Sequence, residues 1–263
     1  MTAPVISGAE PFQHDGGPGG ALVLHGFTGS PDSMRSIAEM LAEKEYAVDL
    51  PLLPGHGTAI EDMLDTGWAD WSMAAEDAYR HLADRCERVV VVGLSMGGTL
   101  ACWLAERYPE IAGIAVVNPG VEPPEDTFRA VIRDMLDSGT PVAPAIGSDI
   151  AKPGVVELSY PGTPLAPVLS YFEGVDEVAS NLERITCPVL LFSSREDHVL
   201  PTSNGDFLAA GVSGPCQRVW LDRSFHVATL DNDAELVESR IIDFAGELLH
   251  PASRAAMPGK VEA

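Results

Sequence analysis

Basic residues are scarce in this sequence of 263 residues. It contains 16 Lys and Arg against 39 Asp and Glu, which gives a formal net charge of −23 and a pI near 4.4. Proteins that bind nucleic acids or anionic membranes through charge need a basic surface, so both classes of partner are disfavoured. Only three lysines occur, Lys44, Lys152 and Lys260, and none follows a glycine-rich phosphate-binding loop. This excludes a nucleotide triphosphatase of the Walker type.

Cysteines are equally few, and long apolar runs are missing. The four cysteines form no Cys-x-x-Cys pair, and two of them adjoin or lie within apolar runs: they are Cys86, Cys102, Cys187 and Cys216. This pattern predicts reduced, partly buried thiols rather than a disulfide framework. No window approaches the length of about eighteen apolar residues that a membrane span needs, and the first residues lack the basic and apolar regions of a secretory signal. We therefore expect a cytoplasmic globular protein, and the sequence leaves its oligomeric state open.

Short apolar runs alternate with helical patterns along much of the chain. Six runs predict buried strands: Ala21–Leu24, Ala47–Leu50, Val89–Val92, Ile114–Val117, Val189–Phe192 and Val219–Leu221. After the first run, Ser30 and Pro31 provide an N-cap and a proline at the first helical position, followed by apolar residues at helical spacing. The alternation predicts an α/β fold, with a mostly parallel central sheet and helices on both faces.

The stretch from residue 119 to residue 168 breaks this pattern. It holds nine of the 21 prolines and no clear strand, although Phe128–Leu136 could form a short amphipathic helix. Irregular stretches of this length inside a domain are usually lids or insertions. The alternative is a disordered linker, which is disfavoured because too few residues follow for a second core. We predict an α/β core at 1–120 and 178–250, a lid insertion at 121–177 and a flexible tail at 251–263.

A Gly-x-Ser-x-Gly motif, from Gly93 to Gly97, directly follows the third predicted strand. Glycines on both sides of Ser95 permit a sharp turn between strand and helix. Such a turn places the hydroxyl at the carboxyl end of the sheet, beside the N-terminus of a helix predicted over Gly97–Tyr108. A serine that only caps this helix is the alternative. We favour Ser95 as a nucleophile.

A serine nucleophile needs a base that is held in place by an acid. In sheets with this type of turn, the acid follows the next-to-last strand and the histidine follows the last strand. Asp197 and His226 occupy these positions, so Ser95, Asp197 and His226 are the predicted catalytic triad. Glu196 is a competing acid, and His198 is a competing base that would require a different strand order.

The first predicted strand ends in His25-Gly26-Phe27. A small residue here lets the backbone pass close to the nucleophile, so the N–H groups of Phe27 and Met96 are expected to form the oxyanion hole. The Phe27 side chain could equally be an ordinary core aromatic. The segment Pro54–Gly57 predicts a tight turn that holds the loops together.

Together these motifs resemble the α/β-hydrolase superfamily, and within it the small bacterial monoacylglycerol lipases and related carboxylesterases. The resemblance covers most of residues 5–249. It rests on HGFTGSPDSMR (25–35), LPGHGT (53–58), GLSMGGTL (93–100), ITCPVL (185–190), EDHVLP (196–201) and FHVATLD (225–231).

This resemblance implies hydrolysis of a carboxylic ester through an acyl-enzyme on Ser95, with no metal or organic cofactor. It also implies a lid at 119–177 that shapes an apolar acyl pocket. Glu157 matches a lid glutamate that contacts the glycerol head group in this family, and Asn118 is a weaker candidate for the same pocket. The lid holds more proline and glycine than is typical of the family, so the preferred acyl length is left open.

Other functions remain compatible with the same residues. A general short-to-medium-chain carboxylesterase, an acyl thioesterase or a C–C bond hydrolase would use the same triad, and a non-catalytic binder of apolar ligands would share the fold. Dehalogenases and epoxide hydrolases are disfavoured because those relatives carry an aspartate at the nucleophile position. Any contact with a lipid surface would come from apolar lid side chains rather than from charge.

Overall fold

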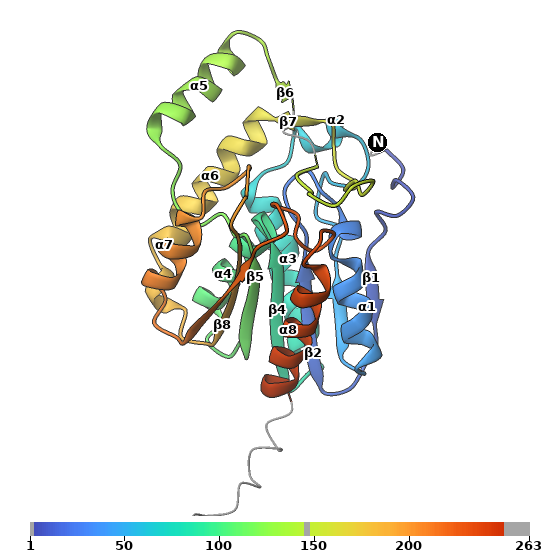
Figure 1. The fold of residues 1–263 in the computed structure, drawn as a ribbon. Coiled ribbons are helices and arrows are strands. Elements are labelled where there is room, and N and C mark those ends of the chain that lie inside the picture. Colours follow the sequence, from blue (N-terminus) through green and yellow to red (C-terminus); the bar gives the residue numbers. More distant parts are fainter. Residues whose placement is uncertain (1–2, 145–147, 250–263) are drawn as a thin grey trace, which may run out of the picture.

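A seven-stranded sheet, in the order β1-β3-β2-β4-β5-β8-β9, forms the centre of the computed structural model, which describes residues 3–144 and 148–249 (Figure 1). Its strands are β1 (Phe12–His14), β2 (Gly19–Leu24), β3 (Ala47–Leu50), β4 (Arg88–Leu94), β5 (Gly113–Val117), β8 (Val189–Ser194) and β9 (Cys216–Leu221). Only the β1–β3 pair is antiparallel among these pairings. The tail predicted at 251–263 lies outside the described residues.

Helices cover both faces of this sheet. They are α1 (Arg35–Glu43), α2 (Ile60–Met63), α3 (Trp68–Ala83), α4 (Met96–Arg107), α5 (Asp126–Asp137), α6 (Leu165–Ala179), α7 (Ser203–Gly211) and α8 (Ala234–Leu249), with 3-10 turns η1 (Pro31–Met34) and η2 (Leu182–Arg184). Side chains alternate along β2, so that Leu22 packs with α3 and α4 while Val23 packs with α1 and α8. Because both faces are covered, the central strands β2, β4 and β5 are almost entirely apolar.

The predicted α/β fold is confirmed, and all six predicted strands lie within strands of the main sheet. Strand β1 was not predicted, because its three residues, an exposed one between two half-buried ones, form no apolar run. Ser30 and Pro31 occupy the N-cap and first helical positions as predicted, although the helix that they open is the 3-10 turn η1, which precedes α1. The hydroxyl of Ser30 makes no capping bond and donates instead to the carbonyl of Leu158 at 2.9 Å.

The segment from residue 121 to residue 177, here called the insert, lies between β5 and β8 in the chain. Helix α5 confirms the predicted amphipathic helix, but the expectation of no strand was wrong, because β6 (Val142–Pro144) pairs with β7 (Gly162–Pro164). Helix α6 runs past residue 177, so the predicted boundary falls inside a helix. Pro167 lies in its first turn, where a missing N–H is tolerated. The elements α5, β6, β7 and α6 gather beyond one end of the sheet in Figure 1.

The four cysteines are all free, and two of them are buried, as the sequence predicts. Within residues 3–144 and 148–249, no helix is both long enough and apolar enough to cross a membrane.

Candidate active site

Ser95 lies in a strained turn between β4 and α4. Its φ of 54° and ψ of −117° are unusual for a residue with a side chain, and such backbone strain costs about 1–3 kcal/mol. A Cβ atom at Gly93 would lie 2.1 Å from the carbonyl oxygen of Gly97, and one at Gly97 would lie 2.2 Å from that of Leu24. Only glycine therefore fits at the two motif positions that flank the serine.

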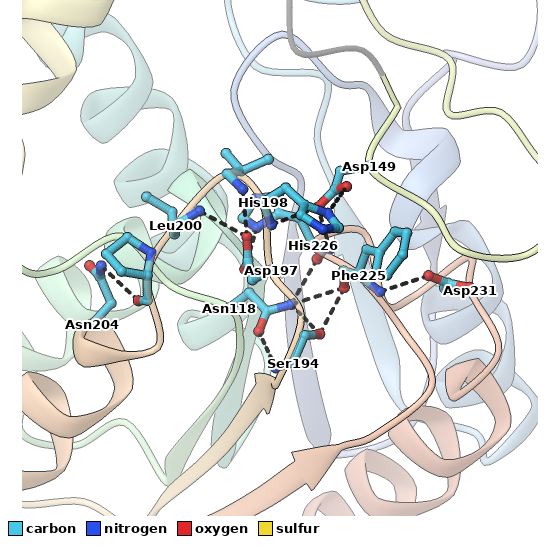
Figure 2. A network of polar contacts seen from close by, with 12 residues as sticks. Asn118, Asp149, Ser194, Asp197, His198, Leu200, Asn204, Phe225, His226 and Asp231 are labelled. Atoms are coloured by element: carbon cyan, nitrogen blue, oxygen red, sulfur yellow. Dashed lines mark hydrogen bonds and ion pairs between the residues drawn. The ribbon is translucent and has the colours of Figure 1, made fainter.

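Asp197 and His226 are in direct contact at the carboxyl end of the sheet. The carboxylate oxygen Oδ2 of Asp197 lies 2.8 Å from Nδ1 of His226, and both side chains are buried (Figure 2). The other oxygen of Asp197 accepts the N–H groups of Val199 and Leu200, each at 2.8 Å. These bonds fix the carboxylate so that its other oxygen faces the imidazole of His226.

Ser95 and His226 both line a cavity of about 550 Å³. The turn after β4, the loop after β9 and the insert all contribute to its walls. Its apolar lining is formed largely by Phe27, Phe128, Val168, Tyr171, Phe172, Val175, Val199, Leu200 and Val227. A cavity of this size and character accommodates a drug-sized apolar ligand next to a few polar groups.

The charged groups around this cavity are of one sign. Four carboxylates line it: Glu122, Glu125, Asp149 and Glu157. Among the described residues that line the cavity, there is no lysine or arginine. The cavity therefore favours neutral ligands over anionic ones. The described residues also contain no group of three or more His, Cys, Asp or Glu side chains that could hold a metal ion.

The loop after β2 passes close to Ser95. A Cβ atom at Gly26 would lie 3.4 Å from Cβ of Ser95. The ring of Phe27 lines the cavity and stacks on Tyr171 with the centroids 6.0 Å apart, so the side chain packs while the main chain runs past the serine. Met96 opens α4, and the first N–H groups of a helix have no acceptor within the helix. An oxyanion hole at the Phe27 and Met96 amides stays a prediction.

His25 and His56 are buried structural histidines. Nδ1 of His25 lies 3.0 Å from the Gly26 carbonyl, and its Nε2 accepts the N–H of Leu53 at 3.2 Å. Burial lowers the pKa of His25 to about 4 and that of His56 to about 3. The rings lie 5.0 Å apart, and Nδ1 of His56 is 3.0 Å from the Pro54 carbonyl. Both rings therefore stay neutral. Their hydrogen bonds connect the loops after β2 and β3, which agrees with the structural role predicted for Pro54–Gly57.

Glu157 reaches the cavity from the insert. Its backbone N–H donates to the Ser148 hydroxyl at 2.8 Å, and its carboxylate lies so close to Gly29 that a Cβ atom there would be 2.7 Å from Oε1. Burial raises the pKa of Glu157 to about 7, although the charge of His226 acts in the opposite direction. Glu157 therefore provides a carboxyl group that titrates near neutral pH in the same cavity as His226.

Asn118 occupies a different place from the one the resemblance implies. It follows β5 with a φ of 44°, and it is not among the described residues that line the 550 Å³ cavity. Its amide donates to the His226 carbonyl at 2.8 Å and to the Ser194 hydroxyl at 2.9 Å, and its oxygen accepts the N–H of Ser194 at 2.8 Å (Figure 2). The amide thus joins the end of β8 to the loop of His226, and contact with a substrate head group is not supported.

Among the competing residues, Glu196 is exposed and His198 faces another carboxylate. Nδ1 of His198 lies 2.8 Å from Oδ1 of Asp149, a buried residue of the insert. Asp149 also accepts the backbone N–H of His226 at 3.0 Å. The sequence gives no signal for Asp149, because one acidic residue in an irregular segment belongs to no motif.

Comparisons with known proteins agree on one family. The family model "Alpha/beta hydrolase family" matches residues 21–239. A thermostable monoacylglycerol lipase of Bacillus sp. (strain H-257) is 44% identical over 244 residues, which cover 92% of this chain and 96% of that protein. A carboxylesterase of Bacillus subtilis (strain 168) is 27% identical over 91% of this chain and 97% of its own length.

Solved structures give the same fold. A structure described under "LipS and LipT, two metagenome-derived lipolytic enzymes" superposes with a TM-score of 0.88 at 40% identity, over 93% of this chain and all of that chain. A monoacylglycerol lipase of Paleococcus ferrophilus superposes with a TM-score of 0.75 over 89% of this chain and 97% of its own, at 16% identity. At 16% identity, the similarity to the Paleococcus ferrophilus enzyme shows only that the two chains share a fold.

Proposed function

The chain belongs to the alpha/beta hydrolase family, and we propose that it is a serine ester hydrolase that cleaves monoacylglycerols to glycerol and a fatty acid. The main observation behind this proposal is the Asp197–His226 pair, because His226 lines the same cavity as Ser95. The similarity to a bacterial monoacylglycerol lipase along nearly the whole chain supports the substrate class.

In the proposed reaction, Nε2 of His226 takes the proton of the Ser95 hydroxyl as Oγ attacks the ester carbonyl. The N–H groups of Phe27 and Met96 stabilise the negative oxygen, each by about 3 kcal/mol. His226 then protonates the leaving glycerol oxygen, and the acyl group remains on Ser95. Water attacks this acyl-enzyme, again with His226 as base, and releases the fatty acid and the free hydroxyl.

The test compares kcat/KM for 1-monoacylglycerols with kcat/KM for alkyl and p-nitrophenyl esters of the same acyl groups, from butanoyl to octadecanoyl. Faster hydrolysis of the glycerol esters at every chain length is expected. Equal rates for both series, with a steep fall beyond short acyl chains, would identify a general carboxylesterase instead. A serine-reactive phosphonate that binds in the cavity without labelling Ser95 would indicate a non-catalytic binder.

Glu157 is proposed to bind the glycerol head, since it shares the cavity with His226. Replacing it by alanine should lower kcat/KM for monoacylglycerols about tenfold, the effect of one lost hydrogen bond to a carboxyl group. Hydrolysis of a p-nitrophenyl ester with the same acyl chain serves as the control, and its kcat/KM should change less than about twofold. An equal loss on both substrates would remove Glu157 from the head-group site.

The four carboxylates of the cavity also predict that acyl-coenzyme A is a poor substrate. Coenzyme A carries phosphates, which these carboxylates repel, so kcat/KM for an acyl-coenzyme A should be at least about tenfold below that for an uncharged thioester of the same acyl group. The difference in kcat/KM between the two thioesters should decrease as salt is added, because salt screens the repulsion between the carboxylates and the phosphates. A faster reaction with coenzyme A thioesters would favour a thioesterase.

We further propose that the protein acts in the cytoplasm and meets lipid aggregates through the insert. Phe128 and Val131 are about half exposed on α5, and Phe128 also lines the cavity. The net charge of −23 favours apolar over electrostatic contact with a lipid surface, and it disfavours nucleic-acid partners.

A further inference from the structure

We propose that Asp149, a residue of the insert, is a positioning residue that holds the loops of Asp197 and His226 in the arrangement that catalysis requires. The inference rests on the proposed function, because it assigns catalysis to these two side chains. It adds that the insert, which lines the cavity, also positions the acid Asp197 and the base His226.

The side chain of Asp149 bridges the two loops. Its Oδ2 accepts the backbone N–H of His226 at 3.0 Å and that of His198 at 3.1 Å, and His198 directly follows Asp197 (Figure 2). Its Oδ1 lies 2.8 Å from Nδ1 of His198. One carboxylate therefore bonds to the main chain of the base and to the main chain next to the acid.

Burial of the Asp149 side chain strengthens its hydrogen bonds to the two loops. The residue is 9% exposed, so water competes poorly for its oxygens, and hydrogen bonds to an ionised acceptor are stronger than neutral ones. The main chain adds a further bond, since the carbonyl of Asp149 accepts the N–H of Val227 at 3.1 Å. Asp149 thus contacts two consecutive residues of the loop after β9.

A second carboxylate fastens the same part of the insert. Asp231 accepts the N–H groups of Ala151 at 2.7 Å and Lys152 at 2.9 Å, and it also accepts the N–H of Phe225 at 2.8 Å. Residues 149–152 and the loop after β9 are therefore joined by two carboxylates, Asp149 from the insert and Asp231 from the loop. A displacement of this part of the insert would move His226 along with it.

The rate of catalysis is expected to depend strongly on the position of His226 relative to Asp197 and Ser95. His226 must reach Asp197 on one side and the candidate nucleophile on the other, and a misplacement of about 1 Å in a reacting group costs about a hundredfold in rate. We expect Asp149→Ala to lower kcat about 10- to 100-fold on monoacylglycerol and p-nitrophenyl ester alike, with KM changed less than about threefold. In Asp149→Asn, the remaining carbonyl oxygen can still accept both N–H groups, so most of the kcat should return.

Asp233 provides the matched control. It is also a buried carboxylate of the loop after β9, but it bonds to the N–H of Arg223 at 2.9 Å and to the Ser224 hydroxyl at 3.0 Å. Asp233→Ala should lower the melting temperature while leaving kcat within about threefold. Equal losses of kcat in Asp233→Ala and Asp149→Ala would show that loop stability alone matters, and would overturn the inference.

The experiment measures kcat, KM and the rate at which a serine-reactive phosphonate labels Ser95. Failure of the wild-type protein to react with phosphonate would defeat the proposed function itself. A wild-type protein that reacts, together with an Asp149→Ala variant that reacts equally fast, would defeat only the role of Asp149. If Asp149→Ala does not fold, Asp149→Ser takes its place, because the shorter hydroxyl cannot bond to both loops. The same loss of kcat is then expected, and wild-type kcat would overturn the inference.

Discussion

Replacing Ser95 with alanine is expected to lower kcat/KM on esters by roughly four to six powers of ten, the usual contribution of a triad nucleophile. The change removes the one atom that forms the acyl-enzyme in the proposed mechanism. Alanine can adopt the same strained backbone as serine, so the melting temperature should stay close to that of the wild-type protein. Steady-state kinetics on a monoacylglycerol, together with a thermal melt, provide the measurement.

A serine outside the cavity serves as the control for this substitution. Ser72 is buried in α3, and its hydroxyl donates to the Ala69 carbonyl at 3.3 Å. Ser72→Ala should retain nearly full activity. A Ser95→Ala variant that kept most of the wild-type rate would show that another group is the nucleophile.

The second large effect concerns stability and involves Glu106, which is not among the described residues that line the cavity. This residue of α4 has a side chain that is 1% exposed, and neither carboxylate oxygen has a hydrogen-bond partner among the described residues. The nearest cation of a neighbouring side chain, on Arg107, lies 3.8 Å away. Burial raises the pKa of Glu106 from 4.5 to about 8, and Arg107 offsets only part of this effect.

Glu106→Gln is therefore expected to stabilise the protein in alkaline solution. Below pH 4.5 the carboxyl group is protonated in the folded and the unfolded state, so it makes no pH-dependent contribution. Between pH 4.5 and about 8 the unfolded state loses the proton first, and the free energy of unfolding falls by up to about 1.4 kcal/mol per pH unit. Glutamine has no such titration, so the advantage of the variant should grow with pH, by up to about 5 kcal/mol at pH 9.

Denaturant unfolding from pH 5 to pH 9 would measure this difference. The exposed carboxylate of Glu43, at the end of α1, provides a matched control, and Glu43→Gln should shift the free energy of unfolding by less than about 0.5 kcal/mol at every pH. If the difference between Glu106→Gln and wild type did not change with pH, Glu106 would not titrate in this range.

The core could be predicted because its signals are local. Strands covered on both faces are largely apolar, as the run Val89–Val92 shows. The order of these runs places Ser95, Asp197 and His226 at the carboxyl end of the sheet. The contact between Asp197 and His226 follows from the parallel pairing of β8 with β9.

The insert could not be predicted in the same way, because its structure depends on distant partners. The prolines at the start of α6 resemble those of an irregular segment, although the first turn of a helix tolerates them. Asp149 acquires its role only through hydrogen bonds to residues about 50 to 80 positions away. Asn118 was misplaced for a related reason: its amide bonds to Ser194 and His226, which the sequence does not bring near it.

The pairing of β5 with β8 has a consequence for how this fold can change over evolution. Val116 lies opposite Leu191, although the chain between these strands includes the whole insert. The entropy lost on closing a loop grows only with the logarithm of its length, so doubling the connection costs only about 0.6 kcal/mol. The sheet thus tolerates longer or shorter connections at this point with little loss of stability. New substrate preferences can arise by insertion and deletion in the parts of the insert outside residues 149–152, while the sheet stays unchanged.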